Sequence, residues 1–165
     1  MREADVRFGG AAPEAVDQRL KKAVAVYADA PRAEALLLDA QAIEPHCLPV
    51  YFALYKFYFH KYRLADAERA ALRALEASAQ QAGFLADWTA LTPWSADWSD
   101  VSGPQHFYLF SLKALAFIRL RLGHAADARA ILAKLAELDP RDRVGGSVIR
   151  ALAMATAPGR EAVVS

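Results

Sequence analysis

Apolar residues recur along the chain at helical spacing, and no stretch shows the strict alternation of a half-buried strand. Proline and glycine mark the boundaries of the predicted helices. Pro31 suits the start of a helix, and Pro45 and Pro140 each follow a helical stretch and end it. Gly123 separates the two members of the last clear pair of helices. The sequence therefore predicts an all-α fold, with helices at 13–29, 32–43, 48–62, 65–81, 105–122, 125–138 and 146–156.

These predicted helices repeat in pairs at a fixed offset. A shift of 34 residues carries Leu20 onto Leu54 and Ala33 onto Ala67. A further shift of 61 residues carries Ala67 onto Ala128, and this shift equals one period of 34 plus an insertion of about 27 residues. An internal period of this length is typical of stacked helical repeats. We therefore expect repeats at 14–47, 48–81 and 109–142, with an insertion at 82–108.

The residues that carry the period form a known pattern. In the middle repeat an aromatic residue, a leucine and a tyrosine precede spaced alanines, namely Tyr51, Leu54, Tyr58, Ala67, Ala71 and Ala74. The last repeat has Leu112, Leu115, Gly123, Ala128, Leu132 and Pro140. This pattern resembles the tetratricopeptide repeat (TPR), although Asp17 stands where an aromatic is usual and Tyr62 where a glycine is usual.

The resemblance implies a fold for the whole chain. We expect a single domain at 1–157, built as a right-handed α–α superhelix of antiparallel helix pairs. A C-terminal capping helix at 146–156 would shield the last repeat, and a flexible tail would follow at 158–165. The alternative is a generic helical bundle with a chance repeat.

The resemblance also implies which side chains line a concave groove formed by the first helix of each pair. They are Gln18, Lys22, Phe52, Lys56, Phe59, His60, Lys113, Phe117 and Arg121. This set is aromatic and basic, and it contains no acid. It suits an acidic or aromatic-bearing peptide, because cations contact carboxylates and rings supply contact area. The alternative is that the phenylalanines are buried between helices and the cations only face solvent.

The insertion at 82–108 holds all three tryptophans of the protein, Trp88, Trp94 and Trp98. No lysine or arginine occurs between Arg73 and Lys113. Burial of one tryptophan is worth about 4–6 kcal/mol, so we expect the segment to pack on something. One interpretation is a structural wedge in which Thr92–Pro93 starts a short helix. The other is a lid that folds over the basic groove.

Charge and composition narrow the classes of partner. The formal net charge is +1, which gives no general attraction to nucleic acid or to an anionic membrane. No apolar run is long enough to predict a membrane-spanning helix. The single cysteine, Cys47, cannot form an internal disulfide, which suits a reducing compartment, and we expect a cytoplasmic protein. The abundance of alanine and arginine indicates a bacterial source.

The chain carries no recognisable catalytic or metal-binding motif. Its four histidines, His46, His60, His106 and His124, belong to no HExxH pattern, and no phosphate-binding glycine loop occurs. We therefore expect no catalytic residue, no metal and no cofactor. The leading hypothesis is a scaffold or adaptor that binds a partner polypeptide. The alternatives are a chaperone-like holder of a secreted or aggregation-prone client, and a homo-oligomerisation domain that forms a dimer through exposed aromatics.

Overall fold

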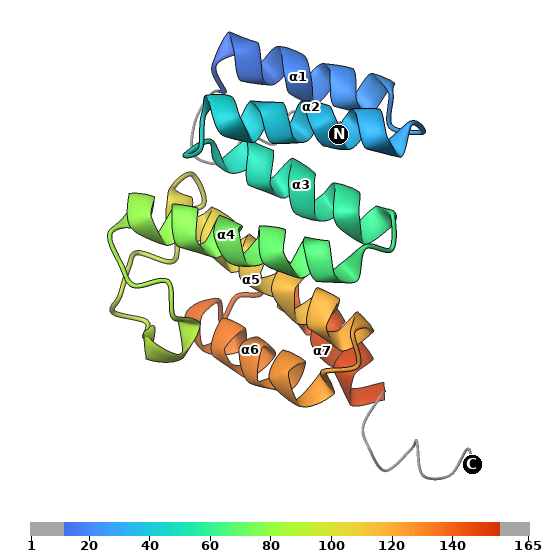
Figure 1. Cartoon of the computed structure of the whole chain (residues 1–165). Coiled ribbons are helices and arrows are strands. Elements are labelled where there is room, and N and C mark those ends of the chain that lie inside the picture. The colour runs from blue at the N-terminus through green and yellow to red at the C-terminus, as the bar shows by residue number, and fades with distance from the viewer. Residues whose placement is uncertain (1–11, 156–165) are drawn as a thin grey trace, which may run out of the picture.

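The computed structural model describes residues 12–155, which form a stack of helices (Figure 1). The elements are α1 (Glu14–Ala25), α2 (Ala30–Ile43), α3 (Leu48–His60), α4 (Leu64–Ala82), the short 3₁₀ helix η2 (Trp88–Ala90), α5 (Pro104–Arg121), α6 (Ala125–Leu138) and α7 (Gly146–Ala155). No strand occurs in this range, so the all-α prediction is confirmed. The predicted tail at 158–165 and the start of the predicted domain at 1–11 lie outside the described residues.

The seven predicted helices are all present, and the main error lies at the first turn. The predicted helix at 13–29 ends at Ala25, because a turn follows in which the Asp29 N–H donates to the Val26 carbonyl at 2.8 Å. The side chain of Asp29 then accepts the Arg32 N–H at 3.3 Å and caps α2. This cap starts α2 at Ala30, ahead of Pro31, rather than at residue 32.

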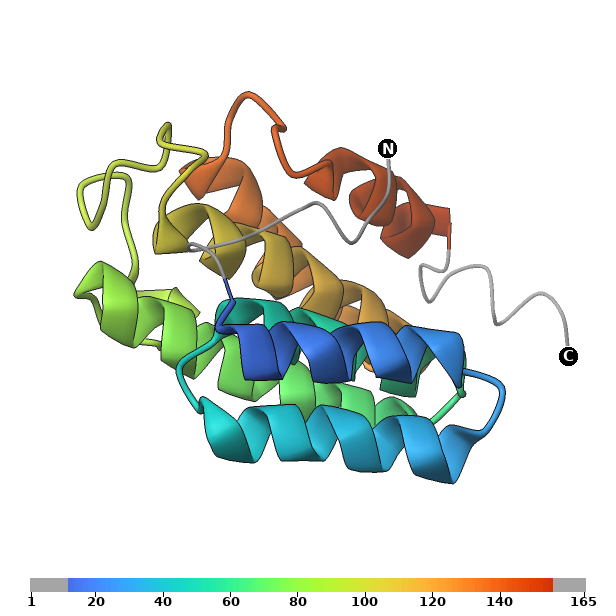
Figure 2. The ribbon, with the colours of Figure 1, turned by 90° about the horizontal axis from the view of Figure 1, so that it is seen from above.

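The helices pack in a regular order. Each α-helix packs on the next along the chain, and the odd-numbered helices also pack in sequence, α1 on α3, α3 on α5 and α5 on α7. Figure 2 shows the same stack from above. The odd-numbered helices therefore form a continuous row, and α4 lies against both α3 and α5.

Two of the turns between paired helices repeat in detail. Tyr62, after α3, and Gly123, after α5, both have left-handed backbones, with φ of 59° and 87°. In each turn the next N–H, that of Arg63 or of His124, donates to the carbonyl five positions earlier, at 2.9 and 2.8 Å. Tyr62 thus adopts the conformation that glycine adopts more easily. Tyr62 and Gly123 are 61 residues apart, so the backbone conformation of the turns repeats at the same offset as the sequence.

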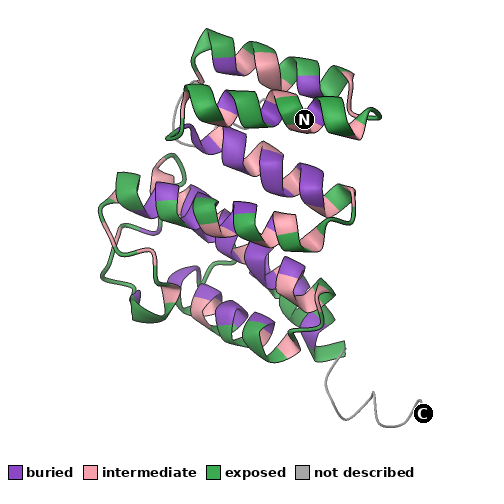
Figure 3. Cartoon of the chain, in the orientation of Figure 1, coloured by how far each residue is buried: buried purple, intermediate pink, exposed green. Residues whose placement is uncertain are grey.

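The core is built from alanines on one helix and large side chains on its neighbours. Figure 3 shows how much of α3 and α5 is buried. Along α4 the buried residues are small except for Leu75, namely Ala67, Ala70, Ala71, Ala74, Ala77, Ser78 and Ala79. Small side chains let helix axes approach closely, which places the larger residues of α3 and α5 in the spaces between turns. Ser78 is satisfied locally, since its hydroxyl donates to the Ala74 carbonyl at 2.7 Å.

The segment between α4 and α5 is mostly irregular. Gly83, in the left-handed region, ends α4, and α5 already begins at Pro104. The prediction that Thr92–Pro93 starts a helix is wrong. Residues 92–95 instead form a closed turn, in which the Ser95 hydroxyl accepts the Thr92 N–H at 2.9 Å and the Thr92 carbonyl accepts the Ser95 N–H at 3.0 Å.

A polar cluster ties α2 to the following pair of helices. The carboxylate of Glu34 accepts the hydroxyl of Tyr58 at 2.6 Å and pairs with Arg63 at 2.9 Å. The bonds from Arg63 and Tyr58 hold the pKa of Glu34 below its usual value of 4.5. The stabilisation that this carboxylate contributes is therefore complete above pH 4.5 and is lost as the pH falls through the lower pKa of the folded state.

We expect the substitution Glu34→Gln to reduce the acid sensitivity of the fold. The difference in the free energy of unfolding between wild type and Glu34→Gln should shrink as the pH is lowered from neutrality to below 4.5. Urea unfolding at a series of pH values measures this difference. The control is Asp39→Asn, an exposed acid on the same helix. Parallel pH profiles for Glu34→Gln and wild type would contradict the assignment.

Candidate interaction surface

One face of α3 carries aromatic and basic side chains at helical spacing. Phe52, Lys56 and Phe59 are four and three residues apart, so they lie along one side of the helix. Leu54 and Tyr58, which are buried, lie on its other side. The three side chains of the aromatic and basic face are half-buried rather than enclosed.

The neighbouring helix α5 carries a matching face. Phe110, Lys113 and Phe117 are three and four residues apart, and Arg121 continues the same row. The rings of the two helices meet in pairs. The centroids of Phe52 and Phe110 are 5.7 Å apart, and those of Phe59 and Phe117 are 5.0 Å apart. Aromatic contacts therefore bridge α3 and α5 at two levels.

Basic groups lie over these rings. The Lys56 Nζ is 5.6 Å from the centroid of Phe52, and the Lys113 Nζ is 4.5 Å from that of Phe110. The Arg121 guanidinium is 5.9 Å from the centroid of Phe59. These distances fall in the range of cation–π attraction. We call this surface the α3–α5 seam, and define it as Phe52, Lys56, Phe59, Phe110, Lys113, Phe117 and Arg121.

The structure brings together six of the nine residues that the sequence predicts for a groove. Gln18 and Lys22 are exposed on α1, at the positions that precede Phe52 and Lys56 by 34 residues. His60 lies at the end of α3, where its Nδ1 is 3.2 Å from the hydroxyl of Tyr27. Phe110 is the seam residue that sequence reasoning missed, although its place three residues before Lys113 was a usable signal.

The seam places positive charge where solvent is partly excluded. Burial lowers the pKa of Lys56. Burial also lowers the pKa of Lys113, although the carboxylate of Asp142 opposes the shift. The pKa of His60 is lowered by burial and then by the nearby cations Lys56 and Lys61. An anionic group placed beside Lys113 would offset the energy that this cation loses through burial.

Acids are unevenly distributed among the helices, although Asp142, before α7, lies close enough to Lys113 to act on its pKa. α3, α5 and α7 contain no aspartate or glutamate in their sequences. α2, α4 and α6 each contain acids, and so does the insertion. The row that α3, α5 and α7 form is therefore purely basic in its charged groups, while α1 adds Glu14 and Asp17.

The insertion lies at the other end of α5, against α6 and the turn that follows it. Trp98 is buried, with its ring centroid 5.2 Å from that of Phe84. The Lys134 Nζ donates to the Leu91 carbonyl at 2.7 Å. Trp88 is half-buried and Trp94 is 93% exposed, so the segment packs mainly through Trp98 while the indole of Trp94 lies in solvent. To act as a lid over the seam, the insertion would have to leave these contacts.

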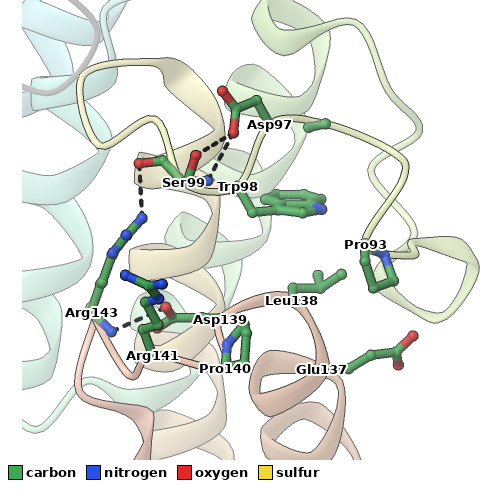
Figure 4. A pocket seen from close by; sticks show the side chains of 11 residues that line it. Pro93, Asp97, Trp98, Ser99, Glu137, Leu138, Asp139, Pro140, Arg141 and Arg143 are labelled. Atoms are coloured by element: carbon green, nitrogen blue, oxygen red, sulfur yellow. Dashed lines mark hydrogen bonds between the residues drawn. The ribbon is translucent and has the colours of Figure 1, made fainter.

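A cavity of about 520 Å³ opens between the insertion and the turn from α6 to α7 (Figure 4). Its walls include Trp98 and Ser99 on one side and Pro140, Arg141 and Arg143 on the other. The Arg143 guanidinium joins the two sides, since it donates to the Ser99 carbonyl at 2.9 Å. Sequence reasoning did not find this cavity, because its walls lie about forty residues apart and share no periodic pattern.

Residues 12–155 contain neither a candidate metal site nor a candidate membrane span. No group of three or more histidine, cysteine or acidic side chains converges there as a metal site would require. None of the helices has both the length and the apolar character needed to cross a lipid bilayer.

Comparison with known proteins finds a relative of similar size. An uncharacterised 19.8 kDa protein in the nifW 5′ region of Azotobacter chroococcum mcd 1 is 33% identical over 124 residues, which cover 71% of this chain and 67% of that protein. No family model matches the chain. No solved structure matches it either.

Proposed function

The chain belongs to one family with the 19.8 kDa protein in the nifW 5′ region of Azotobacter chroococcum mcd 1, and we propose that it is a protein-interaction module. It binds an acidic, aromatic-bearing polypeptide on the α3–α5 seam. The observation that carries this proposal is the segregation of charge, since α3, α5 and α7 contain cations and no acids. The proposal assigns no catalytic role, metal or cofactor to the chain.

The chemistry of the seam supports this class of partner. Phe59 and Phe117 are half-buried with the cation of Arg121 beside them, so an incoming ring can pack on them while a carboxylate meets the guanidinium. Lys56 and Lys113 have partly lost their hydration in the free protein. A carboxylate therefore gains more from these lysines than from fully hydrated ones.

The order of packing supports a TPR-like superhelix as the scaffold of this surface. In such a superhelix the first helix of each pair lies beside the first helix of the next, as α1, α3 and α5 do here. α7 packs on α5 and α6, where a capping helix belongs. A cytoplasmic location is part of the proposal, and the buried, unpaired thiol of Cys47 supports it.

Charge reversal on the seam tests the proposal. The probe is a fluorescein-labelled peptide of glutamate and phenylalanine, and fluorescence anisotropy measures its binding. We expect Lys56→Glu/Arg121→Glu to weaken binding by about tenfold to a hundredfold, because like charges then face the peptide. The single variant Arg121→Glu, at an exposed position, should weaken binding in the same direction if the double variant does not fold.

The matched control is Arg32→Glu/Arg73→Glu, which makes the same change in net charge at exposed positions of α2 and α4. This control should bind the peptide within about twofold of wild type, since the contact at the seam is intact. Equal losses of peptide affinity in both double variants would show that only the net charge of the protein attracts the peptide. That result, or failure of the wild type to prefer this peptide over one of lysine and phenylalanine, would refute the assignment of the seam.

A further inference from the structure

Trp94 is the most exposed large apolar side chain among residues 12–155, with 93% of its surface accessible. A tryptophan that remains in solvent gives up a large hydrophobic gain. Leu85 and Val101, also in the insertion, are exposed as well. Trp94 therefore offers a large apolar surface to a contact with another molecule.

The backbone holds Trp94 in a defined place. The Trp94 N–H donates to the Thr92 hydroxyl at 3.2 Å, within the closed turn at 92–95. The buried Trp98 stabilises this turn, because its Nε1 donates to the Thr92 carbonyl at 3.0 Å. An anchor that is already ordered loses little conformational freedom when it docks.

A socket of suitable size lies beside this indole. The cavity of about 520 Å³ includes Pro93, the residue before Trp94, in its wall, while Trp94 itself is not part of the lining. Leu138 and Pro140 give the wall apolar surface, and Arg141 gives it a cation. An indole face can pack on both residues, since the arginine offers cation–π attraction and the proline offers apolar ring surface.

The acids around the socket are engaged within the chain. Asp97 accepts the Ser99 N–H at 3.1 Å, and Asp139 accepts the N–H groups of Arg143 and Val144, each at 3.0 Å. Arg141 forms no hydrogen bond or ion pair within the described part of the chain. Arg141 is exposed on this side of the socket, so its guanidinium can meet an acidic group of another chain.

The opposite side of the same surface is acidic. The segment at 83–103 contains Asp87, Asp97 and Asp100 and no lysine or arginine. A two-fold axis through this surface would set the acidic insertion of one copy against Arg141 and Arg143 of the other. It would also set each exposed indole against the socket of the other copy, which is the self-complementarity that a closed dimer needs.

We propose that two copies of this chain associate through reciprocal insertion of Trp94 into the cavity between the insertion and the turn from α6 to α7. The contact is small. Two indoles bury about 150–250 Å² each, against about 1,200–2,000 Å² in a standard interface. The dimer therefore dissociates on dilution. The α3–α5 seam takes no part in it, so each copy keeps its surface for a partner polypeptide.

Sedimentation velocity over a range of concentrations tests the dimer, with tryptophan emission as a second readout. The wild type should sediment as a dimer at high concentration, and its emission should shift to shorter wavelength as the exposed indole enters the socket. Trp94→Ala should weaken self-association by at least about tenfold, as expected for a central aromatic anchor. Arg141→Glu leaves the indole in place and changes the socket, and it should weaken self-association in the same direction.

The matched control is Leu38→Ala, which removes an exposed apolar side chain from α2. It should leave the dimer unchanged, and Trp94→Ala should still bind the acidic peptide at the seam. A wild type that stays monomeric at the highest concentration would overturn the proposal. A Trp94→Ala variant that dimerises like the wild type would also overturn it. So would a variant whose self-association is unchanged but which no longer binds a different protein, since Trp94 would then contact that protein and not a second copy.

Discussion

Trp98→Ala is expected to lower the free energy of unfolding by about 3–5 kcal/mol, the usual loss when a buried tryptophan is truncated in a packed core. Trp98 is 7% exposed, and its ring packs against Phe84 and Tyr108, with centroids 5.2 and 6.3 Å away. Tyr108 is fully buried at the start of α5 and donates its hydroxyl to the Ala86 carbonyl at 2.6 Å. Loss of the indole therefore leaves a void at the point where the insertion joins the stack of helices.

Urea unfolding followed by far-ultraviolet circular dichroism measures this loss. Trp94→Ala is the matched control, because it removes the same side chain from the same segment at a position that is 93% exposed. The control should change the free energy of unfolding by no more than about 0.5 kcal/mol, measured at concentrations where the protein is monomeric. Equal losses in the two variants would mean that Trp98 does not anchor the insertion to the core.

Ala71→Leu is expected to lower the free energy of unfolding by about 1–3 kcal/mol, because a close-packed site has no room for three more carbon atoms. Ala71 is fully buried on α4, the helix that packs against both α3 and α5. Leucine is nearly as good a helix former as alanine, so helix propensity cannot account for a loss of this size.

Thermal and urea unfolding measure this loss. The matched control is Ala65→Leu, which makes the same change at an exposed position on the same helix. The exposed variant should lie within about 0.5 kcal/mol of wild type. A stable Ala71→Leu variant would show that the helices around α4 can move apart at little cost. The alanine face of α4 would then not set the spacing of the stack.

Much of the α3–α5 seam follows from the sequence. Phe52, Lys56 and Phe59 are spaced for one face of a helix, and the offset of 61 residues carries Lys56 onto Phe117 in the matching helix. Side chains on one face of a helix are set by its period alone. The resemblance to the tetratricopeptide repeat predicted six members of the seam, and the packing of α3 on α5 adds Phe110 to them.

The seven helices and their pairing were determined by the sequence, because helical periodicity, proline, glycine and the internal repeat are all local signals. Only the tertiary structure decided which tryptophan of the insertion is buried. Trp94 and Trp98 are the same residue type four positions apart, but Trp98 meets Phe84 and Tyr108 while Trp94 meets solvent. Such contacts join segments without a shared period, so their burial depends on how distant parts of the chain come together rather than on any pattern within them.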